Sequence, residues 1–275
     1  MGRIDAHQHF WRYRPDRDTW ITEEMAVLRQ DFLPQDLQPL LAAAGLEGCV
    51  AVQASSDDTA FLLENARRHP FIKGVVGWVD FLAENLGEQL EHLRQYGHLK
   101  GFRHVLQSEP DRDFMLREPF MRGIGQLQPY GFTYDLLIYQ DQLPATLAFV
   151  KAFPNQPFVL DHLAKPSIKA QLIRDWARDI RKLAEQEHVC CKVSGMVTEA
   201  DWQHWTYEDF VPYLEVVVEA FGVNRILYGS DWPVCLLAGS YHRVLGLVER
   251  YFAGFSPAEQ DAIFGGNATR FYKLT

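Results

Sequence analysis

Residues 157–196, PFVLDHLAKPSIKAQLIRDWARDIRKLAEQEHVCCKVSGM, contain the unit that decides the fold. Two short apolar runs, Pro157–Leu163 and Val189–Met196, have the aliphatic and β-branched character of strands that are covered on both faces. Between them, Ile168–His188 carries apolar residues at helical spacing. The pattern predicts a strand, a returning helix and a second, parallel strand, a unit that needs roughly 30 residues.

The same alternation of apolar run and helical segment recurs along the whole chain. Helices are expected at Thr59–Arg68, Leu86–Tyr96 and Phe210–Phe221, among others. Eight strand candidates begin about 32 residues apart on average, as such units require. They are Ile4–Phe10, Gly48–Ser55, Ile72–Phe81, Leu99–Gln107, Phe132–Tyr139, Pro157–Leu163, Val189–Met196 and Arg225–Asp231. Eight parallel strands with helices between them can close on themselves, so we predict an α/β fold, a (β/α)₈ barrel in one domain over residues 1–275.

Length and composition agree with one soluble enzyme-sized domain. The 275 residues are 47% hydrophobic and 23% charged, which are ordinary globular values. The 27 Lys and Arg residues against 36 Asp and Glu residues give a formal charge of −9. This acidic balance argues against a general binder of nucleic acid or anionic membranes. No apolar run reaches the ~18 residues of a transmembrane helix.

The start of the chain and its cysteines indicate a cytoplasmic protein. Residues 1–10, MGRIDAHQHF, lack the apolar region of a signal peptide. The four cysteines have neither CxxC nor zinc-ribbon spacing; they are Cys49, Cys190, Cys191 and Cys235. We expect reduced, mostly buried thiols, which suits a reducing compartment.

Polar residues stand at the carboxyl end of nearly every predicted strand, the face on which such barrels build their active sites. His7 and His9 lie at i and i+2 on the first strand and share a face, so two imidazoles could bind one metal ion. Asp231 ends the last strand before Trp232-Pro233. A carboxylate there could be a metal ligand, a general base or both, or merely form an Asx turn. We expect His7, His9 and Asp231 to hold a metal and Asp231 to be catalytic.

Other strand ends supply further candidates. His162 follows the sixth strand and is expected to be catalytic, as an oxyanion donor or an additional ligand. Arg103 and His104 end the fourth strand, and strict alternation lets only one of them enter the pocket unless the strand bulges. Substrate binding is expected at Trp11, Arg103, His104, Tyr134 and Trp232. Lys165 and Lys192 are further candidates for pocket cations.

The segment Trp11–Leu33 is long for a connection between a strand and a helix. It is rich in Trp, Tyr, Arg and Pro, and it follows the first strand on the catalytic face. Long loops at this face commonly cover the site. We therefore expect it to form a lid, with Trp11 lining the pocket.

Five motifs, taken together and in order, resemble the amidohydrolase superfamily. They are IDAHQHFW at 4–11, GFRH at 101–104, DHLAKP at 161–166, CKVSG at 191–195 and LYGSDWP at 227–233. They look like its TIM-barrel hydrolases of the amidohydrolase 2 type, a branch that includes sugar lactonases of the L-fuconolactonase and L-rhamnono-lactonase kinds. The resemblance implies that His7 and His9 form the metal or substrate pair, that His162 is the sixth-strand histidine, and that Asp231 activates water.

The resemblance also implies an activity and a cofactor. The expected reaction opens a sugar lactone, an aldonolactone like L-fuconolactone, to its aldonic acid with water activated by Asp231. The chain departs from the two-metal pattern of the superfamily, because Arg103-His104 stand where a bridging ligand would be and Tyr134-Asp135 offer no histidine. We expect at most one divalent ion, Zn²⁺ foremost, and metal-free catalysis stays open. The expected partner is a small lactone, with no nucleic acid and no membrane; the oligomeric state is undetermined.

Three other functions stay open at this point. One is a metal-dependent decarboxylase of the same superfamily, which would release CO₂. Another is a dicarboxylate lactonase of the muconolactone kind, although such a substrate needs more than one pocket cation and Arg103 is the only arginine at a predicted strand end. The third is a barrel that binds without catalysing, against which the intact His7, His9, His162 and Asp231 argue.

Overall fold

Eight parallel strands form one sheet, in the order β1 to β8, in a computed structural model that describes residues 2–275. The strands are β1 Ile4–Gln8, β2 Gly48–Val52, β3 Ile72–Gly77, β4 Leu99–His104, β5 Thr133–Leu136, β6 Phe158–Leu160, β7 Val189–Val193 and β8 Ile226–Tyr228. The chain beyond β8 returns to β1, where Gln8 pairs with Trp232 and the Asp231 N–H donates to the His7 carbonyl at 2.9 Å. The predicted (β/α)₈ barrel is confirmed; Met1, the first residue of the predicted domain, lies outside the described residues.

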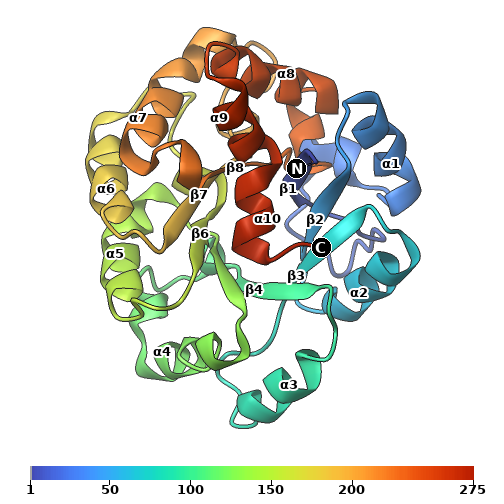
Figure 1. Cartoon of the computed structure of the whole chain (residues 1–275), viewed down its shortest axis with the longest axis vertical. Coiled ribbons are helices and arrows are strands. Elements are labelled where there is room, and N and C mark those ends of the chain that lie inside the picture. The colour runs from blue at the N-terminus through green and yellow to red at the C-terminus, as the bar shows by residue number, and fades with distance from the viewer. Residues whose placement is uncertain (1) are drawn as a thin grey trace.

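Helices surround the barrel (Figure 1). They are α1 Pro34–Ala43, α2 Thr59–Arg68, α3 Leu86–Leu93, α4 Glu118–Ile124, α5 Leu143–Lys151, α6 Arg174–Ala184, α7 Val211–Phe221, α8 Tyr241–Phe252, α9 Pro257–Asp261 and α10 Asn267–Tyr272. One of the first seven helices stands between each strand and the next, as the βαβ repeat requires. Within residues 2–275, no helix combines the length and the apolar character needed to cross a membrane.

The helix α10 seals the amino-terminal end of the barrel, where both chain termini lie (Figure 1). Tyr272 packs into the apolar interior with Ile4 and Val50. Lys100, near the start of β4, donates to the carbonyl of Lys273 at 3.2 Å. The residues of α10 therefore cover the interior at this end.

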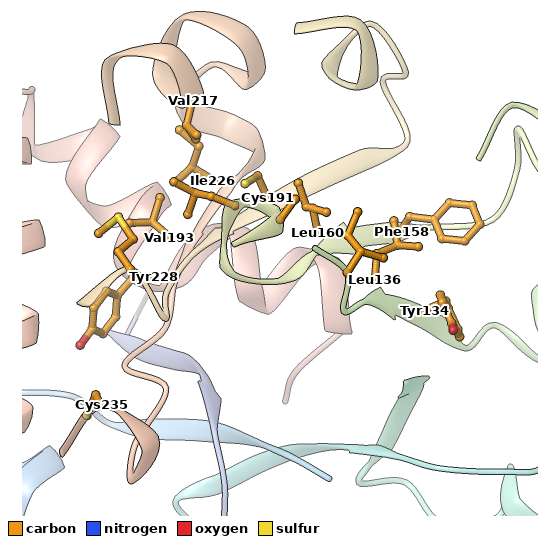
Figure 2. Packing of buried hydrophobic residues seen from close by; sticks show 14 of the residues in the cluster. Tyr134, Leu136, Phe158, Leu160, Cys191, Val193, Val217, Ile226, Tyr228 and Cys235 are labelled. Atoms are coloured by element: carbon orange, nitrogen blue, oxygen red, sulfur yellow. The ribbon is translucent and has the colours of Figure 1, made fainter. Parts of the chain in front are cut away.

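Strict alternation along β5 to β8 separates an outward apolar layer from inward positions that include the buried charged side chains. Figure 2 shows alternate residues of β5 to β8 in the outward layer: Tyr134, Leu136, Phe158, Leu160, Cys191, Val193, Ile226 and Tyr228. The residues between them point inward, among them Asp135 and Lys192, whose side-chain atoms lie 2.5 Å apart. Two successive residues of a strand thus serve different purposes, one in packing and one in the site.

A buried carboxylate ties the two ends of the sheet together. Asp5, on β1, accepts a hydrogen bond from the Ser230 N–H at 2.9 Å and another from the Tyr241 hydroxyl at 3.1 Å. Burial raises the pKa of Asp5 to about 6, although these hydrogen bonds oppose the rise. Asp5 therefore belongs to the framework that holds β1 beside the end of β8, and not to the cavity.

The strands end earlier than the sequence patterns indicate. Ile72–Phe81 is a strand only over Ile72–Gly77, and Pro157–Leu163 only over Phe158–Leu160. Apolar composition extends past each strand because the following turns are also buried. The expected helix Ile168–His188 begins only at Arg174, since Gln171 has a left-handed backbone with φ of 54°. The helix Thr59–Arg68 is found as predicted.

Candidate active site

A cavity of about 620 Å³ lies at the carboxyl ends of the strands and contains the residues expected to be reactive. Its lining consists of His9, Trp11, Trp20, Met25, Ala54, Arg103, Val105, Gln107, Ser108, Leu137, Tyr139, His162, Lys165, Thr198, Glu199, Trp202, Asp231, Val234 and Leu237. A larger groove of about 710 Å³ runs outside the barrel between α2 and α3. Buried polar groups converge in the barrel cavity, which makes it the candidate active site.

His7 and His9 end β1 with their rings turned toward each other. Their Nε2 atoms lie 3.2 Å apart, and both residues are buried. His9 Nδ1 lies 2.7 Å from the Val52 carbonyl oxygen. A carbonyl can only accept a hydrogen bond, so His9 carries its proton on Nδ1 and presents the Nε2 lone pair to His7.

Asp231 faces three imidazoles. Its Oδ1 lies 3.3 Å from His9 Nε2, 3.8 Å from His162 Nε2 and 3.9 Å from His7 Nε2. The residue has a left-handed backbone, with φ of 56°, which turns its carboxylate back over the end of β1. Burial opposes ionisation, but the three nearby imidazoles together hold the pKa of Asp231 below its usual range. The carboxylate is therefore ionised at neutral pH.

His162 reaches the cavity from an unusual backbone turn. The residues after β6 form one left-handed turn, with φ of 53° at His162, 55° at Leu163, 60° at Ala164 and 48° at Lys165. Such a turn costs roughly 1–2 kcal/mol per residue that is not glycine. Residues three apart in a tight turn project to the same side, and His162 and Lys165 both line the cavity. Strain concentrated at a site of this kind is typical of functional positions.

The ring of His162 packs against the residues that follow β7. Its Nδ1 lies 2.9 Å from the Ser194 hydroxyl oxygen. A Cβ atom on Gly195 would lie 2.5 Å from that Nδ1, so only glycine leaves room for the ring. Burial lowers the pKa of His162 to about 4, although Asp231 and Asp161 oppose the change. The imidazole is therefore neutral at neutral pH.

The donor set at this point fits a single divalent metal ion. Ligand atoms of His7, His162 and Asp231 all lie within 4.8 Å of one another, and His9 Nε2 stands beside them. His7 Nδ1 lies 3.2 Å from the carboxylate of Asp161, an arrangement that turns Nε2 toward His9 and Asp231. Nitrogen lone pairs and a carboxylate facing each other at these distances repel, unless a cation or a proton lies between them. Imidazole and carboxylate are ligands that zinc takes in catalytic sites.

A second group of possible ligands, His7, Asp135 and Asp161, lies deeper in the barrel. The ammonium of Lys192 already stands among them, 2.5 Å from Asp135, 2.9 Å from Asp161 and 3.0 Å from His7 Nδ1. Arg103 adds a second cation, 3.1 Å from Asp161. The two carboxylates are thus neutralised by side chains, and this position does not need an ion.

Two of the five expected substrate-binding residues lie at the cavity. Trp11 lines it and donates its indole N–H to the Gln30 carbonyl at 3.0 Å. Trp20 and Met25, from the same segment, line it too, as expected of a covering loop. Arg103 is the member of the Arg103-His104 pair that turns inward, and it also contacts the Gln53 carbonyl.

The remaining three expected substrate-binding residues lie off the cavity, which corrects that part of the prediction. His104 turns outward, where its Nε2 lies 2.6 Å from Glu109 and its ring stacks on Phe114. Tyr134 points into the outward layer shown in Figure 2, because its neighbour Asp135 takes the inward position. Trp232 packs against the rings of Phe10 and Phe32, and Phe32 belongs to the segment Trp11–Leu33.

Other residues at the site carried weaker signals in the sequence. Lys165 was a candidate and does line the cavity, whereas the candidate Lys192 lies beneath it in the buried charge network. Tyr139, Glu199 and Trp202 line the cavity without having been singled out. They lie on loops beyond the strands, where no periodicity indicates which side chain turns inward.

Comparisons with known proteins agree with this geometry. A family model described as Amidohydrolase matches residues 4–274. An L-fucono-1,5-lactonase from Burkholderia multivorans is 44% identical, over 99% of this chain and 96% of the relative. An L-fucono-1,5-lactonase from Burkholderia ambifaria is 36% identical with the same coverage.

A solved structure extends the comparison to three dimensions. The crystal structure of an amidohydrolase from Burkholderia multivorans with bound zinc has a TM-score of 0.97 to this chain and is 44% identical, with all of both chains covered. A second crystal form of an amidohydrolase from that organism, with bound HEPES, also has a TM-score of 0.97. Sequence, fold and the His/Asp cluster together lead to one conclusion: the chain belongs to the amidohydrolase family.

Proposed function

We propose that the chain hydrolyses a sugar lactone, an aldonolactone of the six-carbon L-fuconolactone type, to its aldonic acid. The observation that carries the proposal is the Asp231 carboxylate, ionised and facing three imidazoles on the floor of a cavity with aromatic walls. The two L-fucono-1,5-lactonases that match nearly the whole chain support the same substrate class.

Asp231 is the general base of the proposed reaction. As water attacks the lactone carbonyl carbon, a water proton passes to the Asp231 carboxylate and the carbonyl oxygen becomes an oxyanion. The bond between the carbonyl carbon and the ring oxygen then breaks, and the proton held by Asp231 passes to that oxygen. The ring opens to a hydroxy acid, which loses its own proton to solvent at neutral pH.

Hydrogen-bond donors around Asp231 stabilise the oxyanion. In the tautomer in which the Ser194 hydroxyl donates to Nδ1, His162 carries its proton on Nε2 and presents a neutral N–H to the cavity. Arg103, fixed by Asp161, supplies charged N–H groups beside it. One donor of this kind in a dry site contributes roughly 3 kcal/mol to the stability of the transition state.

The metal, where bound, would be held by His7, His9 and Asp231, with His162 beside them. A divalent ion such as Zn²⁺ at this position polarises a carbonyl oxygen and makes a nearby water more acidic. Asp231 is the proposed proton acceptor in either case, because its carboxylate faces all three imidazoles. We propose one ion per chain at most, since Lys192 fills the deeper group of carboxylates.

Aromatic side chains provide the surface for the sugar ring. Trp11, Trp20, Tyr139 and Trp202 line the cavity, and the apolar face of a sugar ring packs well on aromatic rings.

We further propose a cytoplasmic enzyme that acts on small molecules and binds neither nucleic acid nor membranes. Its four cysteines are free thiols, which suits a reducing compartment.

The direct test of this function is a panel of lactones, with hydrolysis followed by acid release. We expect kcat/KM on aldonolactones to exceed that on dicarboxylate lactones by at least about tenfold, because a neutral hydroxylated ring suits a cavity with few free cations. The opposite order would contradict the sugar assignment, and release of CO₂ from an aromatic acid would indicate the decarboxylase.

Asp231→Asn should remove the general base without disturbing the backbone. Asparagine tolerates the left-handed conformation found at this position. We expect kcat to fall by roughly 10²–10⁴-fold, with an unchanged circular dichroism spectrum. The matched control is Asp201→Asn, an exposed aspartate outside the cavity, which should keep full activity. Near wild-type turnover in Asp231→Asn would exclude Asp231 as the base.

Metal content tests the proposed ligands. Purified protein loaded with zinc should contain one ion per chain or fewer by elemental analysis. His9→Gln should weaken zinc binding by at least about tenfold, as loss of a ligand requires, while His104→Gln, whose ring lies off the cavity, should bind zinc like the wild type. Chelation should leave part of the activity, because Asp231 still accepts the proton. Two tightly bound ions, or equal zinc affinity in both variants, would refute the arrangement.

A further inference from the structure

An ion pair on the cavity wall is left unused by the proposed mechanism. Lys165 comes from the left-handed turn after β6, and Glu199 ends the 3-10 turn Val197–Glu199 after β7. Both line the cavity, and their side chains are largely buried, with 18% and 21% of their surface exposed. Lys165 Nζ lies 3.8 Å from Glu199 Oε1 and 5.5 Å from the centre of the Tyr139 ring.

A second ion pair joins the same two segments outside the cavity. Lys169 Nζ lies 3.2 Å from Asp201 Oδ2, and the side chains are 69% and 40% exposed. Neither residue lines the cavity. The two pairs therefore bridge the same loops, but only Lys165 and Glu199 can touch a bound molecule, and the outer pair provides a matched control.

The gap between Lys165 and Glu199 suits a hydroxyl group. At 3.8 Å the ammonium and the carboxylate attract each other but are too far apart for a hydrogen bond. A hydroxyl can accept from Lys165 Nζ and donate to Glu199 at the same time, whereas a carboxylate can only accept and would be repelled by Glu199. Burial raises the pKa of Glu199, and the ammonium of Lys165 opposes that rise.

The charges around the cavity also favour a neutral hydroxyl over a carboxylate. The cavity's two lining cations are Arg103 and Lys165, and each faces a carboxylate: Asp161, shared with Lys192, at 3.1 Å from Arg103, and Glu199 at 3.8 Å from Lys165. Among residues 2–275 that line the cavity, no lysine or arginine is thus left without an acidic partner. Because a buried carboxylate on a substrate needs such a free cation, the cavity as built disfavours anionic lactones.

We propose that Lys165 and Glu199 form a hydroxyl-binding subsite that selects neutral polyhydroxylated lactones and rejects lactones that carry a carboxylate. The proposal rests on the proposed lactone hydrolysis and makes Glu199 the specificity-determining residue. Replacing Glu199 by a neutral group of the same shape leaves Lys165 as a free cation in the cavity. The cavity then gains what a carboxylated lactone requires and loses an acceptor for the sugar hydroxyl.

Glu199→Gln provides the test, with kcat and KM measured on a neutral aldonolactone and on a lactone bearing a carboxylate. We expect the ratio of the two kcat/KM values to move toward the carboxylated lactone by at least about tenfold, since one unpaired buried charge discriminates at this level. The change should appear mainly in KM, because the proposed pair binds a substrate hydroxyl and takes no part in the proton transfer. Asp201→Asn should leave the ratio as in the wild type. Equal ratios in the two variants would overturn the proposal.

Lys165→Met gives an independent second variant. It should raise KM for the aldonolactone at least about fivefold, as loss of a charged hydrogen bond predicts, leave kcat within a small factor, and give no gain on the carboxylated lactone. Lys169→Met should change neither constant. An unchanged KM in Lys165→Met would overturn the proposal even if Glu199→Gln did not fold.

Binding measurements separate this proposal from the proposed function. Calorimetry with a non-hydrolysable aldonolactam and with a small dicarboxylate requires no turnover. We expect wild-type protein to bind the lactam more tightly and Glu199→Gln to shift its preference toward the dicarboxylate. If no lactone is hydrolysed but this shift occurs, the reaction assignment fails and the subsite stands. If lactones are hydrolysed and the shift is absent, only the subsite fails.

Discussion

The interior of the barrel depends on the ion pairs that the buried ammonium of Lys192 forms. Asp135 and Asp161 both point into the closed barrel, and two unpaired buried carboxylates would cost several kcal/mol each. Lys192 contacts both, and Arg103 adds a second cation at Asp161. Asp161 in turn contacts His7 Nδ1 and so orients the ring toward Asp231. Removal of one of these charged side chains would leave its partners charged and buried. It would also free the His7 ring, around which the His/Asp cluster is built.

The sequence was sufficient to predict the barrel because each of its eight units repeats one pattern. It also predicted that His7, His9, His162 and Asp231 lie together, as they do, since residues at the carboxyl ends of parallel strands must meet on one face. Alternation indicated that only one of Arg103 and His104 enters the pocket. Had the same rule been applied to the adjacent Tyr134 and Asp135, it would have predicted that Tyr134 points outward, as it does in the structure.

What the sequence could not indicate depends on tertiary contacts. The left-handed turn at His162–Lys165 contains no glycine, so the local sequence does not predict it. It is held in part by distant contacts, such as the Trp176 indole N–H that donates to the Leu163 carbonyl at 2.7 Å. Glu199 and Trp202 lie on a loop whose inward face is set by packing. The residues that would govern specificity are therefore less predictable than those that would perform the chemistry, because the latter follow directly on strand ends and the former lie farther out on loops.

The central claim is that chemistry and selectivity meet in one cavity at the carboxyl ends of the strands. The most direct test is a crystal structure of the Asp231→Asn protein with an unreacted aldonolactone bound. The account predicts the lactone carbonyl carbon beside Asn at position 231 and the side chain of His162, and a ring or chain hydroxyl between Lys165 and Glu199. A lactone bound in the groove between α2 and α3, or one in the cavity with its carbonyl turned away from position 231, would contradict it.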